Sequence, residues 1–111
     1  TANGKAEGRR FIQRLKERTD DRDKPISPLA FHRQLKAVHN WGTQEPFDLT
    51  GITQPVFVAN GDHDRMVPTS NSTDLARRLP NARLRIYPDA GHGGIFQNHD
   101  QFVTEALDFL A

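Results

Sequence analysis

The chain has 111 residues, of which 35% are hydrophobic and 26% charged, and its formal net charge at pH 7 is +1. A sequence of this length forms one modest domain or part of one, and it buries a smaller share of its surface than a larger domain does. It contains no cysteine, which excludes a disulfide framework, a thiolate nucleophile and a zinc site built on sulfur.

An amphipathic helix is predicted over residues 8–18. Phe11, Ile12 and Leu15 fall on one helical face, and five basic side chains surround the rest. Residues 1–42 hold ten Lys and Arg against five Asp and Glu, whereas the remainder of the chain holds five against nine. The basic half could contact nucleic acid, but it lacks interleaved aromatic residues and any recognised binding motif. We therefore expect a solvated charged face and no nucleic-acid partner.

A second helix is predicted from Ser27-Pro28 to about Trp41, where Gly42 ends it. Residues 19–25, which precede it, contain no apolar side chain and indicate a solvated linker. Serine is a preferred N-cap, and proline suits the first helical position. Apolar side chains then recur at helical spacing, and two histidines on the same helix are expected at a core boundary: Phe31, Leu35 and Val38, with His32 and His39.

The second half alternates strand and helix patterns. The continuous apolar run Val56–Ala59 indicates a strand covered on both faces, and the alternating residues 83–87 indicate a strand near a sheet edge. One helix is predicted between the strands, from Ser70 or Asn71 to Leu79. Another is predicted over 100–110, with a broad apolar stripe: Phe102, Val103, Ala106, Leu107 and Leu110. A crossover of this length predicts an α/β fold with parallel pairing and a right-handed connection.

No apolar run approaches the roughly 18 residues that a membrane helix requires, and the first residues lack the apolar region of a signal peptide. We therefore expect no membrane partner, and the compartment stays open with the cytoplasm as the default expectation. The sequence also begins without methionine, which suits a fragment or a processed product.

A loop with side chains suited to acid–base catalysis follows each predicted strand. Residues 60–68 concentrate carboxylates, and residues 88–94 place one imidazole, His92, among glycines. Parallel strands end at the same sheet edge, about 4.8 Å apart, so a carboxylate from the first loop can reach the ring of His92. Such a carboxylate would accept the Nδ1 proton of His92, while Nε2 takes a proton from a nucleophile or water. Glycines beside His92 would let the backbone turn sharply.

These two loops resemble the Gly-x-x-Asp-x-x-Val-Pro acid loop and the Gly-His loop of α/β-hydrolases. The resemblance covers about 52–110 and has the family's order of acid before histidine. By motif position it makes Asp64, rather than Asp62, the acid that pairs with His92. It implies the C-terminal strand-helix-strand-helix part of an α/β-hydrolase parallel sheet, preceded by two helices. Residues 1–24 would end a lid, and residues 25–111 would be the C-terminal part of the core.

The chain departs from the family pattern in having no Gly-x-Ser-x-Gly nucleophile elbow. Its only serines are Ser27, Ser70 and Ser72, and none lies in a strand-to-helix glycine turn. The resemblance therefore implies a fragment whose nucleophile lies upstream and which is inactive by itself. The intact protein would hydrolyse an ester, amide or related bond of a small-molecule substrate without a cofactor.

Two alternatives remain beside the catalytic interpretation. Asp62, His63, Asp64 and His92 could be imagined as a metal cluster, but their loops lack a convincing ligand repeat, so no metal is expected. The same loops could also persist without function in a non-catalytic interaction or assembly module. Two strands alone leave a strand edge and apolar surface unpaired, which predicts self-association or a partner that supplies the missing N-terminal part.

Overall fold

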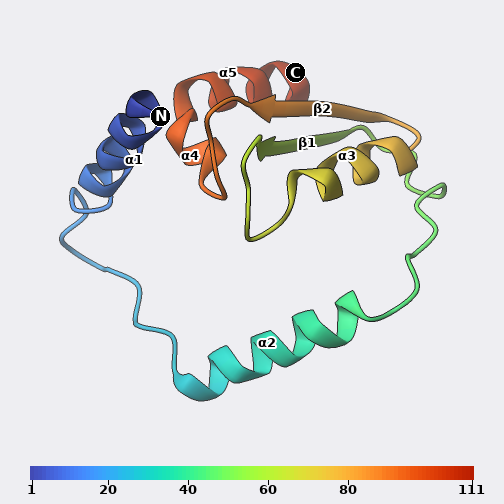
Figure 1. Ribbon diagram of the computed structural model, residues 1–111, viewed down its shortest axis with the longest axis horizontal. Helices are drawn as coiled ribbons and strands as arrows, with labels where there is room; N and C mark the ends of the chain where they lie inside the picture. Colours follow the sequence, from blue (N-terminus) through green and yellow to red (C-terminus); the bar gives the residue numbers. More distant parts are fainter. The chain divides into compact units, whose positions relative to one another are not determined.

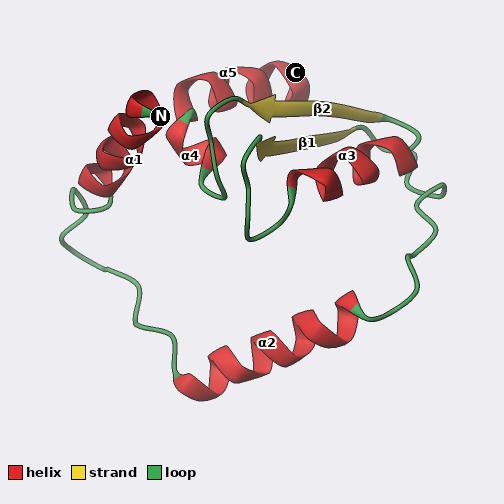
Figure 2. Ribbon diagram, in the orientation of Figure 1, coloured by secondary structure: helices red, strands yellow, loops and turns green.

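The computed structural model describes residues 1–111, and it contains one two-stranded sheet and five helices (Figures 1 and 2). The elements are α1 (Ala2–Arg14), α2 (Pro28–Gly42), β1 (Val56–Gly61), α3 (Thr69–Arg78), β2 (Ala82–Tyr87), α4 (Gly94–Gln97) and α5 (His99–Leu110). Contacts divide the chain into two compact units. One unit joins Thr1–Glu17 to Leu49–Ala111, and the other is Arg18–Asp48.

The smaller unit contains α2, whose predicted bounds are confirmed. Ser27 caps the helix, because its Oγ accepts a hydrogen bond of 3.2 Å from the Ala30 amide, and Pro28 occupies the first helical position. The apolar face is not buried: Phe31, Leu35, Val38 and Trp41 are all exposed. His32 and His39 are exposed as well, so their expected place at a core boundary is wrong.

The larger unit is built on the parallel pair of β1 and β2, as the strand-helix-strand pattern predicts. The register runs from Val56 opposite Ala82 to Gly61 opposite Tyr87, so both strands end at the same edge. Helix α3 lies on one side of the sheet and α5 on the other (Figure 1). Val58 is buried, and the preceding residue, Phe57, stacks against α5. Both faces of β1 are therefore used, as its apolar run predicts.

Helix α5 covers the sheet with one aromatic face. The Phe57 ring lies 6.2 Å from the Phe102 ring and 5.5 Å from the Phe109 ring. The predicted apolar stripe is only partly correct, because three of its members are exposed: Val103, Leu107 and Leu110. The two-stranded sheet contacts only the face of α5 that carries Phe102 and Phe109. The adjacent face of α5, with the three exposed residues, stays uncovered.

Helix α1 begins and ends earlier than predicted, at Ala2–Arg14 instead of residues 8–18. It packs on α4, a single-turn helix that the sequence pattern does not predict, and the rings of Phe11 and Phe96 stack 5.3 Å apart. The boundary predicted after residue 24 coincides with neither end of the smaller unit, and the assignment of a lid and a core stays a prediction. None of the helices combines the length and apolar character needed to cross a membrane.

Candidate active site

The two loops predicted to carry chemistry meet beyond the shared carboxyl edge of the strands. Backbone hydrogen bonds continue the pairing past the sheet: the Asp62 amide donates to the Tyr87 carbonyl at 3.0 Å, and the His63 amide donates to the Ala90 carbonyl at 3.0 Å. Backbone hydrogen bonds therefore hold the two loops together. This places the side chains of the first loop opposite His92.

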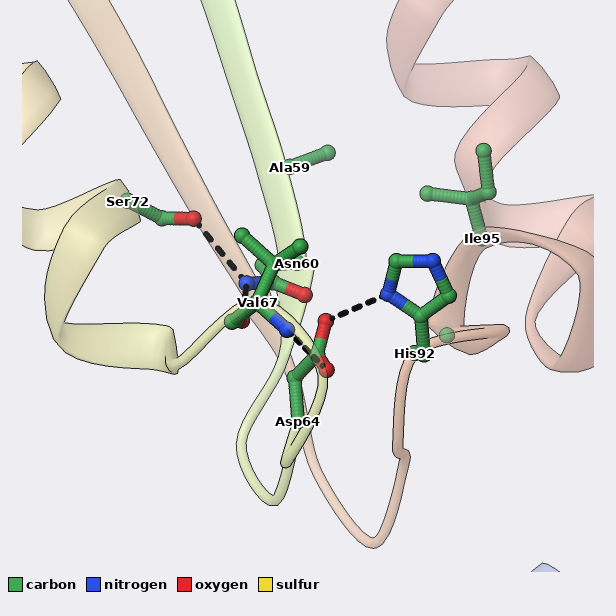
Figure 3. Close-up of a pocket in the computed structure, with 8 residues that line it drawn as sticks. Ala59, Asn60, Asp64, Val67, Ser72, His92 and Ile95 are labelled. Atoms are coloured by element: carbon green, nitrogen blue, oxygen red, sulfur yellow. Dashed lines mark hydrogen bonds and ion pairs between the residues drawn. The ribbon is translucent and has the colours of Figure 1, made fainter. Parts of the chain in front are cut away.

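Asp64 and His92 face each other across this junction, as predicted (Figure 3). Oδ2 of Asp64 lies 3.0 Å from Nδ1 of His92, and Oδ1 accepts hydrogen bonds from the Met66 and Val67 amides at 2.8 and 2.9 Å. The carboxylate side chain is 1% exposed, whereas the imidazole is 53% exposed. A buried acid thus holds a histidine whose other face is open to a reactant. The catalytic role of the pair stays a prediction.

The environment of Asp64 keeps its carboxylate ionised. Burial raises the pKa of Asp64, but the hydrogen bonds from the Val67 amide, from His92 and from the Met66 amide outweigh it, so that the pKa lies below its usual value. A carboxylate that stays charged can accept the Nδ1 proton and stabilise an imidazolium.

Asp62 does not contact His92 as Asp64 does, and instead bonds to Ala90 and His63. Its Oδ1 accepts a hydrogen bond of 3.0 Å from the Ala90 amide and lies 2.7 Å from Nδ1 of His63. The hydrogen bond to His63 lowers the pKa of Asp62 to about 2, against an opposing effect of burial and with help from the Ala90 amide. Asp62 therefore ties the acid loop to the histidine loop, and the motif correctly distinguishes it from Asp64 as the partner of His92.

Close backbone packing at this junction depends on two glycines. A Cβ atom on Gly61 would lie 2.5 Å from the Gly91 carbonyl oxygen and closer still to that of Ala90, and a Cβ on Gly94 would lie 3.0 Å from the Gly61 nitrogen. No glycine has a positive φ; the left-handed residue of the histidine loop is Asp89, with φ 55°. The turn expected at the glycines beside His92 is present, because the Gly94 amide donates to the Gly91 carbonyl at 3.0 Å. The requirement for glycine at position 61 is not predicted from the sequence.

A pocket of about 210 Å³ lies against the pair and is lined by Ala59, Asn60, Asp64, Val67, Ser72, His92, Gly94 and Ile95. The Asn60 amide group donates to the Ser72 hydroxyl at 3.0 Å and to the Val67 carbonyl at 3.3 Å. Figure 3 shows Ser72 on the far side of Asn60 from the His92 ring. Ser72 is therefore not placed to give its proton to His92.

The four residues considered for a metal cluster separate into two pairs. Asp64 binds His92, and Asp62 binds His63. No group of three or more histidine and carboxylate side chains is arranged to hold a metal ion.

Comparison with known proteins gives matches over most of the chain. The model of a family described as alpha/beta hydrolase fold matches residues 7–99. A solved α/β hydrolase fold protein from Chitinophaga pinensis is similar in structure, with a TM-score of 0.90 and 44% sequence identity, over 95% of this chain and 38% of that chain.

Two curated relatives match a shorter stretch of the chain. A non-heme haloperoxidase from Rhodococcus erythropolis is 39% identical over 64 residues, which are 57% of this chain and 23% of that protein. A 2-hydroxy-6-oxo-6-phenylhexa-2,4-dienoate hydrolase from Burkholderia cepacia is 35% identical over 60 residues, which are 54% of this chain and 21% of that protein. The chain therefore spans about a quarter of the length of these curated relatives.

Proposed function

The chain belongs to the α/β-hydrolase fold family, and from that premise we propose that it supplies the acid and the base of a nucleophile–histidine–acid hydrolase. Asp64 is the acid and His92 the base. The observation that carries the proposal is the 3.0 Å contact between the buried Asp64 carboxylate and the half-exposed His92 ring.

The arrangement suits proton transfer at one defined atom. The carboxylate of Asp64 accepts the Nδ1 proton of His92, which leaves the lone pair of Nε2 free to take a proton from a nucleophile. The same carboxylate then stabilises the imidazolium, and Nε2 returns the proton to the leaving group. The lowered pKa of Asp64, in which its amide hydrogen bonds and His92 outweigh burial, keeps that carboxylate charged throughout.

The nucleophile belongs to residues outside this chain. There is no glycine-flanked serine elbow in the sequence, and Ser72 is bound to Asn60 rather than to His92. In the family fold, the nucleophile precedes the acid and the histidine in chain order. The intact protein would then hydrolyse an ester, amide or related bond of a small molecule through a covalent intermediate.

The test compares the chain alone with a fusion protein. In the fusion, the chain is joined to the part of the Chitinophaga protein that lies outside the matched 38%. We expect the fusion to hydrolyse p-nitrophenyl acetate and the chain alone to show no hydrolysis, because the chain alone has no nucleophile elbow. In the fusion, Asp64→Asn should lower kcat by roughly 10⁴-fold, and His92→Gln should lower it to the background rate.

The matched control is His99→Gln, which removes an imidazole at the start of α5, where it pairs with Asp100. It should keep activity within a few-fold of the parent fusion. A well-folded fusion without activity would favour a non-catalytic assembly module on the same fold, and retained hydrolysis in His92→Gln would exclude the proposed base.

A further inference from the structure

Helix α1 contacts both ends of the segment that carries His92. At the near end, the Gly4 amide donates to Oδ2 of Asp89 at 2.8 Å. At the far end, the Arg14 guanidinium donates to the Phe96 carbonyl at 2.6 Å, and the rings of Phe11 and Phe96 stack 5.3 Å apart. Figure 1 shows α1 beside α4. The helix thus contacts the histidine loop on both sides of His92.

Asp89 is held in an uncommon backbone conformation. Its φ of 55° lies in the left-handed region, which disfavours most residues with a side chain and which aspartate tolerates better than most. Its carboxylate accepts from the Gly4 amide, in the first turn of α1, and from the hydroxyl of Thr1, the N-cap of that helix. Amides in a first turn have no backbone partner within the helix, and the Gly4 amide is shared between the Asp89 carboxylate and the Thr1 hydroxyl, which accepts at 3.2 Å.

The approach of α1 to Asp89 is too close for a side chain at position 4. A Cβ on Gly4 would lie 2.9 Å from Oδ2 of Asp89 and 3.0 Å from its carbonyl oxygen. Gly8, one turn later on the same helix, has nothing within 4 Å of such a Cβ. The fit is therefore local to Gly4 and Asp89 and is not a general requirement for glycine along the helix.

The far end of the loop is a short helix that is held by its neighbours, β1, α5 and α1. Helix α4 is four residues long, too short to be stable without tertiary contacts. Its Phe96 is half exposed even with Phe11 stacked against it. Contacts from α1 therefore supply packing that α4 cannot supply itself.

We infer that α1 is a positioning element for His92, with Asp89 and Gly4 as the positioning residues. Held at Asp89 and at Phe96, the loop between them keeps the imidazole opposite Asp64. When α1 leaves, Asp89 loses its partners in that helix, α4 loses its contacts with Phe11 and Arg14, and His92 is released from the acid. The inference concerns the site of the proposed function and rests on it for its catalytic meaning, but it is tested without any measurement of activity.

The experiment compares Gly4→Ala with Gly8→Ala in the 111-residue chain. Both substitutions raise helix propensity by a similar amount, and only the first places a methyl group against Asp89. Two quantities are measured by NMR: amide hydrogen exchange over residues 90–97, and the ring ¹⁵N shifts of His92, which report the tautomer held by Asp64. We expect Gly4→Ala to speed exchange in this segment by about tenfold or more, because local opening sets the exchange rate, and to mix the tautomers. Gly8→Ala should change neither.

Asp89→Asn provides a second variant, because asparagine also tolerates the left-handed region but offers a weaker acceptor to the Gly4 amide. It should reproduce the effect of Gly4→Ala while exchange in β1 and α3 stays unchanged. Identical behaviour of Gly4→Ala and Gly8→Ala would overturn the inference, as would an unchanged His92 tautomer in Asp89→Asn. These outcomes are separate from those of the fusion enzyme, since an inactive fusion leaves the exchange and tautomer results as they are.

Discussion

Tyr87 joins the end of β2 to α5 at the base of the site. Its side chain is fully buried, and its hydroxyl donates to Oε2 of Glu105 at 3.0 Å. Glu105 is also paired with Arg85, whose guanidinium lies 5.5 Å from the centre of the Tyr87 ring. Burial, followed by the hydrogen bond to Glu105, raises the pKa of Tyr87 to about 12. The buried phenol thus holds Tyr87, the last residue of β2, in place, and the histidine loop begins directly after it.

Tyr87 is the only tyrosine in the sequence, so the absorbance of tyrosinate reports this one group. We expect the folded protein to titrate near pH 12, instead of at about 10 as for an exposed tyrosine. The folded state binds the phenol proton of Tyr87 more tightly than the unfolded state does. The contribution of Tyr87 to the free energy of unfolding is therefore complete below pH 10 and is lost as pH rises through 12. Urea unfolding at several alkaline pH values should show this loss in the parent and not in Tyr87→Phe. A midpoint near 10 while circular dichroism still shows the native fold would contradict the burial of this phenol.

At the scale of elements, the junction of β1 with the histidine loop depends on Gly61. Replacing Gly61 by alanine would place a methyl group against the Ala90 and Gly91 carbonyls. The backbone can relieve this steric clash only by moving the two loops apart. We expect Gly61→Ala to destabilise the fold by about 1–3 kcal/mol, the range of an overpacked site, and to lower the midpoint of urea unfolding accordingly. Gly93→Ala is the control, because a Cβ there meets nothing within 4 Å and its φ of −85° suits alanine. Equal midpoints for the two variants would show that the loops are not closely packed.

The elements that sequence predicts well are those whose signals are local. Ser27-Pro28 marks the start of α2 with its own cap, and the apolar run after Pro55 marks β1. Helix α1 begins six residues before the predicted start, because residues 2–7 carry no apolar stripe and are held by Asp89, far along the chain. Helix α4 is a single turn without a pattern. Each miss depends on a tertiary contact that spacing alone cannot express.

The site divides in the same way. The contact between Asp64 and His92 follows from two loops with fixed spacing after paired strands, so the motif predicts it. The bond from Ala90 to Asp62 and the close approach at Gly61 depend on where two backbones cross. Sequence indicates which residue types are present in a loop, whereas only the fold indicates which of them touch.

At the scale of the molecule, the larger unit leaves apolar surface uncovered. Val103, Leu107 and Leu110 are 49%, 64% and 77% exposed on α5. The sheet has only two strands, so β1 and β2 each keep one edge without a partner strand. Open strand edges and contiguous apolar surface both favour association. We propose that the chain by itself associates through these features, which in the longer relatives have further chain available to cover them.

The test is sedimentation velocity of the chain and of two lysine variants on α5. Leu107→Lys replaces an exposed apolar side chain with a charge, and each leucine buried in an interface contributes roughly 1.5–3 kcal/mol. We therefore expect Leu107→Lys to weaken self-association by about tenfold or more. Thr104→Lys is the control, because it adds the same charge on the same helix at an exposed polar position and removes no apolar side chain. A parent chain that sediments as a folded monomer at all concentrations would contradict the proposal, and equal weakening by both lysines would assign the effect to charge and not to the apolar face.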